Sequence, residues 1–135
     1  QKINLKIENI ENIRVLTDSK WLEFIINQII NNSLKYLDKK ESKIEIKAIE
    51  NKKNIVLSIY DNGIGIPKTD INKVFNKSFT GENGRKVSTS TGMGLYICEK
   101  LCKKLGHKIE IESKENEYTK VSITFNKDEF YNVLK

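Results

Sequence analysis

The sequence predicts an α+β fold, a two-layer sandwich with helices packed on one face of a mixed, mostly antiparallel sheet. Short segments of alternating apolar and polar residues occur in consecutive pairs joined by polar turns, which is typical of antiparallel strands. Two longer segments carry apolar residues at the helical period. With 135 residues, the chain is long enough to bury one core. We therefore expect a single domain over residues 1–135.

The N-terminal part is expected to hold two short edge strands and a long helix. Residues 4–7 and 13–16 alternate in hydropathy over only a few positions. In residues 20–37, apolar residues recur at the helical period. The cluster Thr17-Asp18-Ser19 precedes this helix and suits its N-cap.

The remaining elements follow from the same two periods and from turn residues. Gly106 directly follows a helical pattern and predicts its end. Polar segments at 50–53 and 114–117 predict the turns of two hairpins. The expected elements are strands at 43–49 and 54–60, a short helix at 71–75, a polar loop at 77–90, a helix at 94–105, strands at 107–112 and 120–125, and a terminal helical turn at 128–134.

The charge of the chain does not indicate a nucleic-acid partner. The net charge is +6 and the pI is about 9.2, but lysines are spread along the whole sequence among Glu and Asp residues. No apolar segment approaches the roughly 18 residues that a membrane-spanning helix needs. We expect a cytoplasmic domain with no nucleic-acid partner and no direct membrane contact.

The cysteines and the histidine do not indicate a metal centre. Cys98 and Cys102 lie four residues apart on the apolar face of a predicted helix, so we expect small core residues. The only histidine, His107, lies beyond the end of that helix and is expected to be structural or on the surface. Two unpaired cysteines in a core fit a reducing compartment.

Asp61 ends a predicted strand and is followed at once by Gly63 and Gly65. A carboxylate at this place can accept a hydrogen bond from an exocyclic amine, and the glycines let backbone approach a flat ring. A tight turn after a strand has the same pattern. The motif alone therefore leaves both interpretations open.

Gly92 and Gly94 immediately precede a predicted helix. Free N–H groups at a helix N-terminus form an anion site where small residues allow close approach. A flexible loop that ends in a helix would look the same. The pattern gains weight only together with a second nucleotide motif.

Asn32 lies on the first predicted helix among other amide side chains, which are poor helix formers. An Asn oxygen can bind Mg²⁺ beside phosphate oxygens and water. Lys35 is three positions further along the same helix face and can reach a phosphate. Taken singly, either residue also fits an ordinary helix surface.

In this order, the motifs resemble the catalytic, ATP-binding domain of bacterial sensor histidine kinases, a branch of the Bergerat-fold ATPases. The resemblance covers about residues 3–125. The helix with Asn32 is similar to the family's N box, Asp61-x-Gly63-x-Gly65 to its G1 box, residues 75–79 to its F box and Thr91-Gly92-Met93-Gly94-Leu95 to its G2 box.

The resemblance implies a Bergerat fold, ATP and Mg²⁺ as ligands, and a role for each motif. Asp61 would read the adenine amine, Asn32 would hold Mg²⁺ and act with Lys35 in catalysis, and residues 77–91 would form the ATP lid. The nucleotide-binding residues that it implies are Asn32, Lys35, Tyr36, Asp61, Gly63, Gly65, Ile66, Lys77, Phe79, Arg85, Thr91, Gly92, Met93, Gly94 and Leu95.

Two positions depart from the family pattern. Ser90 stands where the G2 box usually opens with another glycine. Gln28, four residues before Asn32, stands where the hydrolysing gyrase, mismatch-repair and chaperone ATPases carry a Glu that activates water. A Gln amide cannot act as a general base. This departure favours phosphoryl transfer to a protein side chain over hydrolysis.

The function implied is transfer of the γ-phosphoryl group of Mg-ATP to a histidine on a separate dimerisation domain, in two-component signal transduction. The partners implied are the dimerisation and phosphoacceptor domain of the same kinase and a cognate response regulator. The alternatives are a nucleotide-binding regulatory module, of the pseudokinase or anti-sigma type, and a gyrase- or chaperone-type ATPase. A P-loop NTPase is excluded because the chain has no GxxxxGK[ST] motif.

Three segments also resemble one subgroup, the short-sensor membrane kinases of low-GC Gram-positive bacteria that respond to cell-envelope peptide antibiotics. These segments are Lys20-Trp21-Leu22, residues 79–85 and residues 90–96. On this resemblance, the chain is a fragment of a longer membrane kinase, and its domain faces the cytoplasm.

Overall fold

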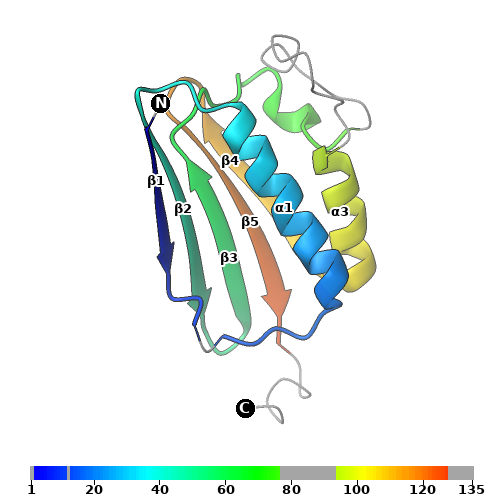
Figure 1. Ribbon diagram of the computed structural model, residues 1–135. Coiled ribbons are helices and arrows are strands. Elements are labelled where there is room, and N and C mark those ends of the chain that lie inside the picture. Colours follow the sequence, from blue (N-terminus) through cyan, green and yellow to red (C-terminus); the bar gives the residue numbers. More distant parts are fainter. Residues whose placement is uncertain (1, 12, 77–93, 128–135) are drawn as a thin grey trace.

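The computed structural model describes residues 2–11, 13–76 and 94–127, which form a five-stranded sheet with two helices packed on one face (Figure 1). The elements in chain order are β1 (Lys2–Glu8), α1 (Ser19–Lys35), β2 (Glu41–Glu50), β3 (Asn54–Asp61), the 3₁₀ helix η1 (Ile71–Lys73), α3 (Gly94–Leu105), β4 (Lys108–Lys114) and β5 (Tyr118–Asn126).

The sheet is mixed, with strand order β1-β2-β3-β5-β4. β1 pairs in parallel with β2, and the other neighbours pair antiparallel. The central position of β3 places Asp61 between two strands, opposite Ile44 of β2 and Thr119 of β5. The predicted two-layer α+β class is confirmed.

The core lies between the helices and the β3–β5–β4 part of the sheet. The buried residues of this cluster are Ile25 and Ile29 of α1, Cys98 and Cys102 of α3, and Ile55, Ile59, Ile109, Val121, Ile123 and Phe125 of the strands. The two cysteines are therefore small core residues, as predicted. The Cys98 thiol donates to the backbone oxygen of Ile25 at 3.7 Å and joins the two helices.

The first helix begins as predicted and ends earlier. The Asp18 carboxylate caps α1 by accepting from the amides of Lys20 and Trp21 at 3.0 and 3.1 Å. The predicted helix ran to residue 37, but α1 ends at Lys35. Tyr36 leaves the helical conformation, and its carbonyl oxygen accepts from the Ile64 amide at 3.0 Å. The chain thus leaves the helix two residues earlier than predicted, and a tertiary hydrogen bond holds Tyr36 outside it.

The predicted strand at residues 13–16 is wrong, because these residues form no strand. Ile13 and Val15 are half-buried and pack against the core cluster. Their alternation reflects contact with the core, and both edges of the sheet belong to other strands, β1 and β4. The short helix predicted at 71–75 is the single 3₁₀ turn η1. The predicted loop at 77–90 and the terminal turn at 128–134 lie outside the described residues.

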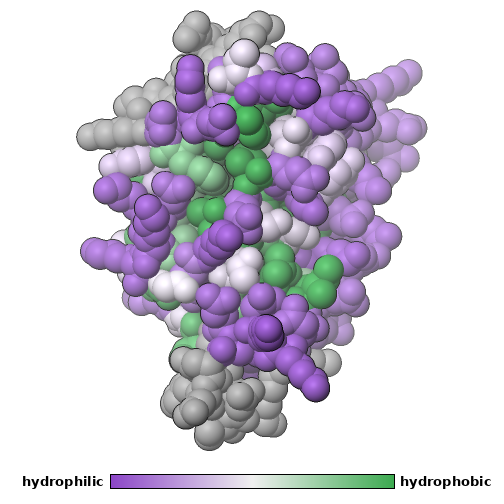
Figure 2. Space-filling model, turned by 180° about the vertical axis from the view of Figure 1, so that it is seen from behind, coloured by the Kyte–Doolittle hydropathy of each residue, from purple (hydrophilic) through white to green (hydrophobic). Residues whose placement is uncertain are grey.

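The opposite face of the sheet carries no helix among the described residues. Figure 2 shows this open face, on which hydrophilic residues predominate and apolar ones form a broken band. Lys and Glu side chains form ion pairs on this face, along one strand in Lys43–Glu45 of β2 and between strands in Lys120–Glu112 of β5 and β4. No helix in the described part of the chain is long and apolar enough to cross a membrane.

Candidate functional site

The C-terminal ends of α1 and β3 and the N-terminal end of α3 lie at the same end of the molecule (Figure 1). Asp61 is the last residue of β3, faces the helices and is 3% exposed. Its carboxylate accepts from the Gly63 amide at 2.9 Å and from the Ser33 hydroxyl of α1. Burial raises the pKa of Asp61, and these two hydrogen bonds and the charge of Lys39 partly oppose the rise.

The two glycines after Asp61 are required by backbone packing. A Cβ atom on Gly63 would lie 2.3 Å from the carbonyl oxygen of Tyr36, and one on Gly65 would lie 2.2 Å from that of Lys114. Gly65 also has a φ of +67°, which side chains disfavour. The close approach that these glycines permit in the structure is therefore to the loop after α1 and to the β4–β5 hairpin.

The turn after Asp61 is held on both sides by hydrogen bonds. Asn62 is bound to β2, because its side-chain oxygen accepts a hydrogen bond from the Lys43 amide at 2.7 Å. The Ile66 amide donates to the Ser113 hydroxyl at 2.9 Å, and the Asn116 amide donates to the carbonyl oxygen of Ile64 at 2.6 Å. The turn is thus fixed by β2 on one side and by the β4–β5 hairpin on the other.

Lys39 lies in the loop between α1 and β2 and binds this turn. Its ammonium group donates to the carbonyl oxygens of Asn62 and Gly63, the latter at 3.2 Å, and to that of Asn116 at 3.3 Å. One cation therefore joins the turn after β3 to the β4–β5 hairpin. Sequence reasoning missed this lysine, since it lies in no motif and its partners are distant in the sequence.

Two further residues near Asp61 were also missed. Ser33 is buried on the face of α1 that carries Ile25 and Ile29. A polar residue at this helical spacing, on a face that is otherwise apolar, could have indicated it from the sequence. Thr119 is 9% exposed and faces Asp61 across the β3–β5 ladder. Its hydroxyl lies 2.9 Å from that of Ser113. Thr119 belongs to no local motif, and only strand register brings it to Asp61.

The predicted residues on α1 lie at the same end as Asp61. Asn32 is half-buried, Lys35 is exposed, and Tyr36 is the half-buried C-cap. Gln28 lies one helical turn before Asn32 on the same side, and its Oε1 would be 3.2 Å from a Cβ atom on Gly94. This side of α1 therefore faces the beginning of α3.

Gly94 is the first residue of α3 and Leu95 the second, and both are half-buried. Ile66 is half-buried in the turn after β3. The other predicted nucleotide-binding residues, Lys77, Phe79, Arg85, Thr91, Gly92 and Met93, lie outside the described residues. The described part of the chain thus brings together the N box, the G1 box and the last residues of the G2 box.

The donor set at this site fits a magnesium ion held mainly by phosphate and water. The described residues contain no group of three or more His, Cys, Asp or Glu side chains that could hold a metal by themselves. Asn32 offers one amide oxygen, and Mg²⁺ is usually bound by one or two protein oxygens together with phosphates. Asn32 is half-buried one helical turn after Gln28, the residue whose amide lies near Gly94, and this position suits that arrangement.

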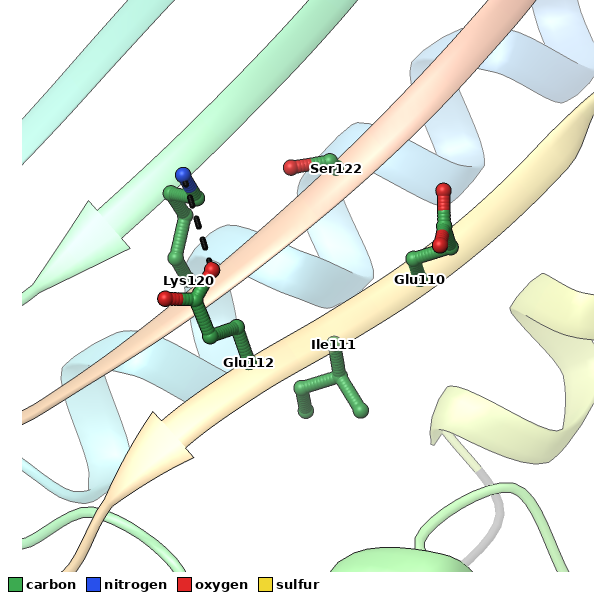
Figure 3. A pocket seen from close by; sticks show the side chains of 5 residues that line it. All are labelled: Glu110, Ile111, Glu112, Lys120 and Ser122. Atoms are coloured by element: carbon green, nitrogen blue, oxygen red, sulfur yellow. Dashed lines mark ion pairs between the residues drawn. The ribbon is translucent and has the colours of Figure 1, made fainter.

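A polar hollow on the open face of the sheet is separate from this site. Figure 3 shows its lining residues on β4 and β5, which are Glu110, Ile111, Glu112, Lys120 and Ser122. Lys120 and Glu112 form an ion pair at 3.8 Å with both side chains largely exposed. Such pairs contribute little to stability. The charged lining residues lie on the sheet face opposite Asp61, and we assign them no function.

Residues 17–129 match the family of histidine kinase-, DNA gyrase B- and HSP90-like ATPases. The chain belongs to this family. The match includes α1, the turn after Asp61 and α3, so the elements that form the candidate site are those that the family shares. The Bergerat fold of this ATPase family is the fold that the sequence predicted.

Curated relatives are sensor kinases. The sensor histidine kinase YxdK of Bacillus subtilis is 39% identical over 112 residues, which cover 83% of this chain and 34% of the relative. The sensor protein BceS of the same organism is 39% identical over 111 residues, 82% of this chain and 33% of the relative. The sensor protein kinase GraS of Staphylococcus aureus is 35% identical over 123 residues, 91% of this chain and 34% of the relative. The chain thus spans about a third of their length.

Two solved structures with the same fold carry the description histidine kinase. The catalytic domain of the histidine kinase ThkA has a TM-score of 0.77 and 25% identity, covering 93% of this chain and 80% of that one. The mycobacterial sensor histidine kinase MprB has a TM-score of 0.76 at 20% identity, covering 93% and 82%. At that identity, the second likeness concerns the fold alone.

Proposed function

We propose that this chain is the ATP-binding catalytic domain of a sensor histidine kinase and forms a single domain over residues 1–135. It binds Mg-ATP and passes the γ-phosphoryl group to a histidine of another domain. The observation that carries this proposal is the buried carboxylate of Asp61, at a strand end beside the turn that Gly63 and Gly65 permit. A desolvated acceptor of this kind is suited to select an exocyclic amine.

The acceptor histidine must lie outside this chain. His107 is the only histidine in the sequence. It is 9% exposed, and its Nε2 lies 2.7 Å from the Thr17 hydroxyl. Its ring packs edge-on against Phe125, with centroids 4.6 Å apart. A buried ring with this hydrogen bond is unavailable as a nucleophile, which supports a domain that phosphorylates another one.

The residues of the chain act by binding and orientation. Asp61 accepts a hydrogen bond from the adenine amine and so holds the nucleotide at the end of β3. The N-terminal amides of α3, which begins at Gly94, would bind the phosphates, and Lys35 would add positive charge. Asn32 would supply the protein oxygen for Mg²⁺, and the bound ion would neutralise charge on the phosphate oxygens. The acceptor imidazole nitrogen then bonds to the γ-phosphorus as the bond to the ADP oxygen breaks.

Gln28 favours this transfer over hydrolysis. Its amide lies beside the first residue of α3, as the 3.2 Å approach to a Cβ on Gly94 indicates. An amide at this place cannot take a proton from water. The gyrase- and chaperone-type alternative therefore lacks its base. A nucleotide-binding regulatory module remains the second candidate, and phosphoryl transfer distinguishes the two.

We also propose the partners and the location of the domain. The partners are the dimerisation and phosphoacceptor domain of the same kinase and a cognate response regulator. We place the domain on the cytoplasmic side of a membrane-anchored protein, where ATP is available. The support is that the relatives are described as sensor kinases and are about three times as long as the matched region.

Titration calorimetry of the chain with ATP, ADP and GTP, each with and without Mg²⁺, tests nucleotide binding. We expect binding that is selective for adenine and tightened by Mg²⁺. The second step adds a histidine phosphoacceptor domain of a relative, such as YxdK, with ATP labelled at the γ-phosphate. Label on the acceptor that survives base and is lost in acid, as for phosphohistidine, supports the kinase.

Each outcome separates the candidate functions. Binding without transfer to any acceptor domain tested favours the regulatory module. Release of inorganic phosphate without an acceptor favours the hydrolysing ATPase. Absence of adenine-selective binding in a folded sample removes the proposal altogether.

A further inference from the structure

The strand β1 forms one edge of the sheet and is its most exposed strand. Among the described residues it pairs only with β2, and Figure 1 shows α1 and α3 over the part of the sheet that is away from β1. Its three apolar residues, Ile3, Leu5 and Ile7, face the helix side and are 45%, 61% and 52% exposed. An exposed edge with an apolar face favours pairing with another strand.

The hydrogen-bonding direction of β1 is fixed by its pairing with β2. The Lys2 amide donates to the carbonyl oxygen of Lys40, so the backbone groups of residues 2, 4, 6 and 8 point toward β2. Those of Ile3, Leu5 and Ile7 point outward. The residues that carry the exposed apolar side chains are therefore also those that offer outward backbone donors and acceptors.

The sequence of β1 is complementary to itself in antiparallel orientation. With Leu5 opposite Leu5 of a second copy, Ile3 faces Ile7 and Lys2 faces Glu8. Asn4 then faces Lys6. Each apolar residue meets another apolar residue on the helix side. On the open side, each end of the strand carries a pair of opposite charges.

The other registers that match the outward groups lack this complementarity. Placing Ile3 opposite Leu5 brings Lys2 opposite Lys6. Placing Leu5 opposite Ile7 brings Lys6 opposite Lys6. Like charges directly opposite each other destabilise a strand pair. Only the register with Leu5 opposite Leu5 therefore pairs all three apolar residues with one another and also avoids like charges opposite each other.

We propose that two copies of this chain associate through β1, antiparallel, with the two Leu5 residues at the two-fold axis. The two sheets then form one continuous sheet, and the same strand supplies both sides of the contact, as two-fold symmetry requires. The candidate nucleotide site lies at the end of β3, so this contact does not depend on the proposed function.

Sedimentation velocity of the chain over a range of concentrations tests this contact. We expect a monomer–dimer equilibrium. Leu5→Lys places like charges at the axis and is expected to raise the dissociation constant roughly tenfold or more. The matched control is Ile49→Lys, because Ile49 is 54% exposed but lies beyond the part of β2 that pairs with β1. Circular dichroism checks that both variants stay folded.

Cysteine cross-linking tests the register independently. Leu5→Cys places two sulfurs on residues whose Cα atoms are about 5.5 Å apart, within disulfide range. Ile3→Cys places its copies about 14 Å apart along the strands. The native thiols stay unreactive because burial raises the pKa of Cys98 to about 12 and that of Cys102 to about 11. We expect a covalent dimer for Leu5→Cys alone.

The proposal is overturned by a chain that stays monomeric at every soluble concentration. It is equally overturned by a dimer that persists unchanged in folded Leu5→Lys, since that dimer uses another surface. Cross-linking of Ile3→Cys in place of Leu5→Cys rejects the register.

Discussion

The carboxyl group of Asp61 is held in a place that water scarcely reaches, and two donors already occupy part of its acceptor capacity. The Gly63 amide binds Oδ1 at 2.9 Å, and the Ser33 hydroxyl donates as well. Burial still raises its pKa above that of an ordinary Asp. Burying a carboxylate in this way destabilises its charged form, and such groups are typical of ligand-binding sites.

Asp61→Asn is expected to weaken adenine nucleotide binding by about 10- to 100-fold, because an amide nitrogen would face the adenine amine donor. The fold remains, since the amide oxygen still accepts from Gly63. Calorimetry with ADP measures the change. The control is Glu110→Gln on the open face of the sheet, which leaves affinity unaltered. Equal affinities of Asp61→Asn and the parent would remove Asp61 from the site.

Asn32→Ala is expected to remove most of the Mg²⁺ dependence of nucleotide binding, because it deletes the assigned protein ligand. ADP affinity measured across a Mg²⁺ titration shows this as a flattened curve. Asn31→Ala, an exposed neighbour on the same helix, is the matched control and keeps the parent curve. Coinciding curves for the two variants would contradict the assignment.

His107 predicts a pH dependence of stability. Burial lowers its pKa, so the folded chain favours the neutral ring. The stabilisation is fully present above the unfolded-state pKa of about 6.5 and is lost as pH falls below it toward the lower folded pKa. Urea unfolding at pH 7.5 and 5.5 measures the loss. His107→Gln, which does not titrate and leaves no other histidine, should show a smaller difference. An equal difference would assign the loss to other groups.

At the scale of elements, the candidate site depends on how the turn after β3 is held. The loop after α1 contributes the carbonyl oxygen of Tyr36 and the ammonium group of Lys39. The β4–β5 hairpin contributes the Ser113 hydroxyl and the Asn116 amide. Because these two segments both hold one turn, a change in either of them is expected to move Asp61.

Gly65→Ala tests this convergence. The new Cβ would lie 2.2 Å from the Lys114 carbonyl oxygen, and φ is +67°, so we expect a loss of about 2 kcal/mol or more in unfolding free energy. Nucleotide affinity should fall with it. Gly106→Ala is the matched control, because its φ is +78° but nothing lies within 4 Å. It should lose about 1–2 kcal/mol and keep its affinity. Equal nucleotide affinity in both variants would show that the conformation of this turn does not affect nucleotide binding.

At the scale of the whole molecule, one apolar cluster fixes the positions of α1, α3 and the sheet relative to one another. Ile25 and Ile29 of α1 meet Cys98 and Cys102 of α3 and the inner face of the strands. The site lies above this cluster and shares its helices. The geometry between Asp61, Asn32 and the start of α3 is therefore a consequence of core packing.

Ile29→Ala is expected to lower the free energy of unfolding by about 2–5 kcal/mol, because Ile29 is 1% exposed and its loss leaves a cavity. Leu34→Ala on the same helix is the control and should change stability by about 0.5 kcal/mol or less, since Leu34 is 45% exposed. Urea unfolding measures both. Similar losses in the two variants would show that Ile29 is not packed in the core as described.

Most of the architecture was predictable because it depends on local periods and caps. The hairpins, the helix that ends just before Gly106 and the cap at Asp18 follow from residues near in sequence. The predictions of a strand at 13–16 and of the last two residues of the first helix failed for one reason. In both segments, tertiary contacts with the core or with Ile64 decide the conformation.

The candidate site divides in the same way. Sequence alone determined the class of fold, the order of the motifs and the roles that we propose for Asp61 and Asn32, because those depend on residue type and spacing. Tertiary structure decided that Ser33, Lys39 and Thr119 surround Asp61, that Gly65 meets the β4–β5 hairpin, and that β1 is an edge. Strand register and helix packing join residues that are far apart in the chain, and no local pattern encodes which of them will meet.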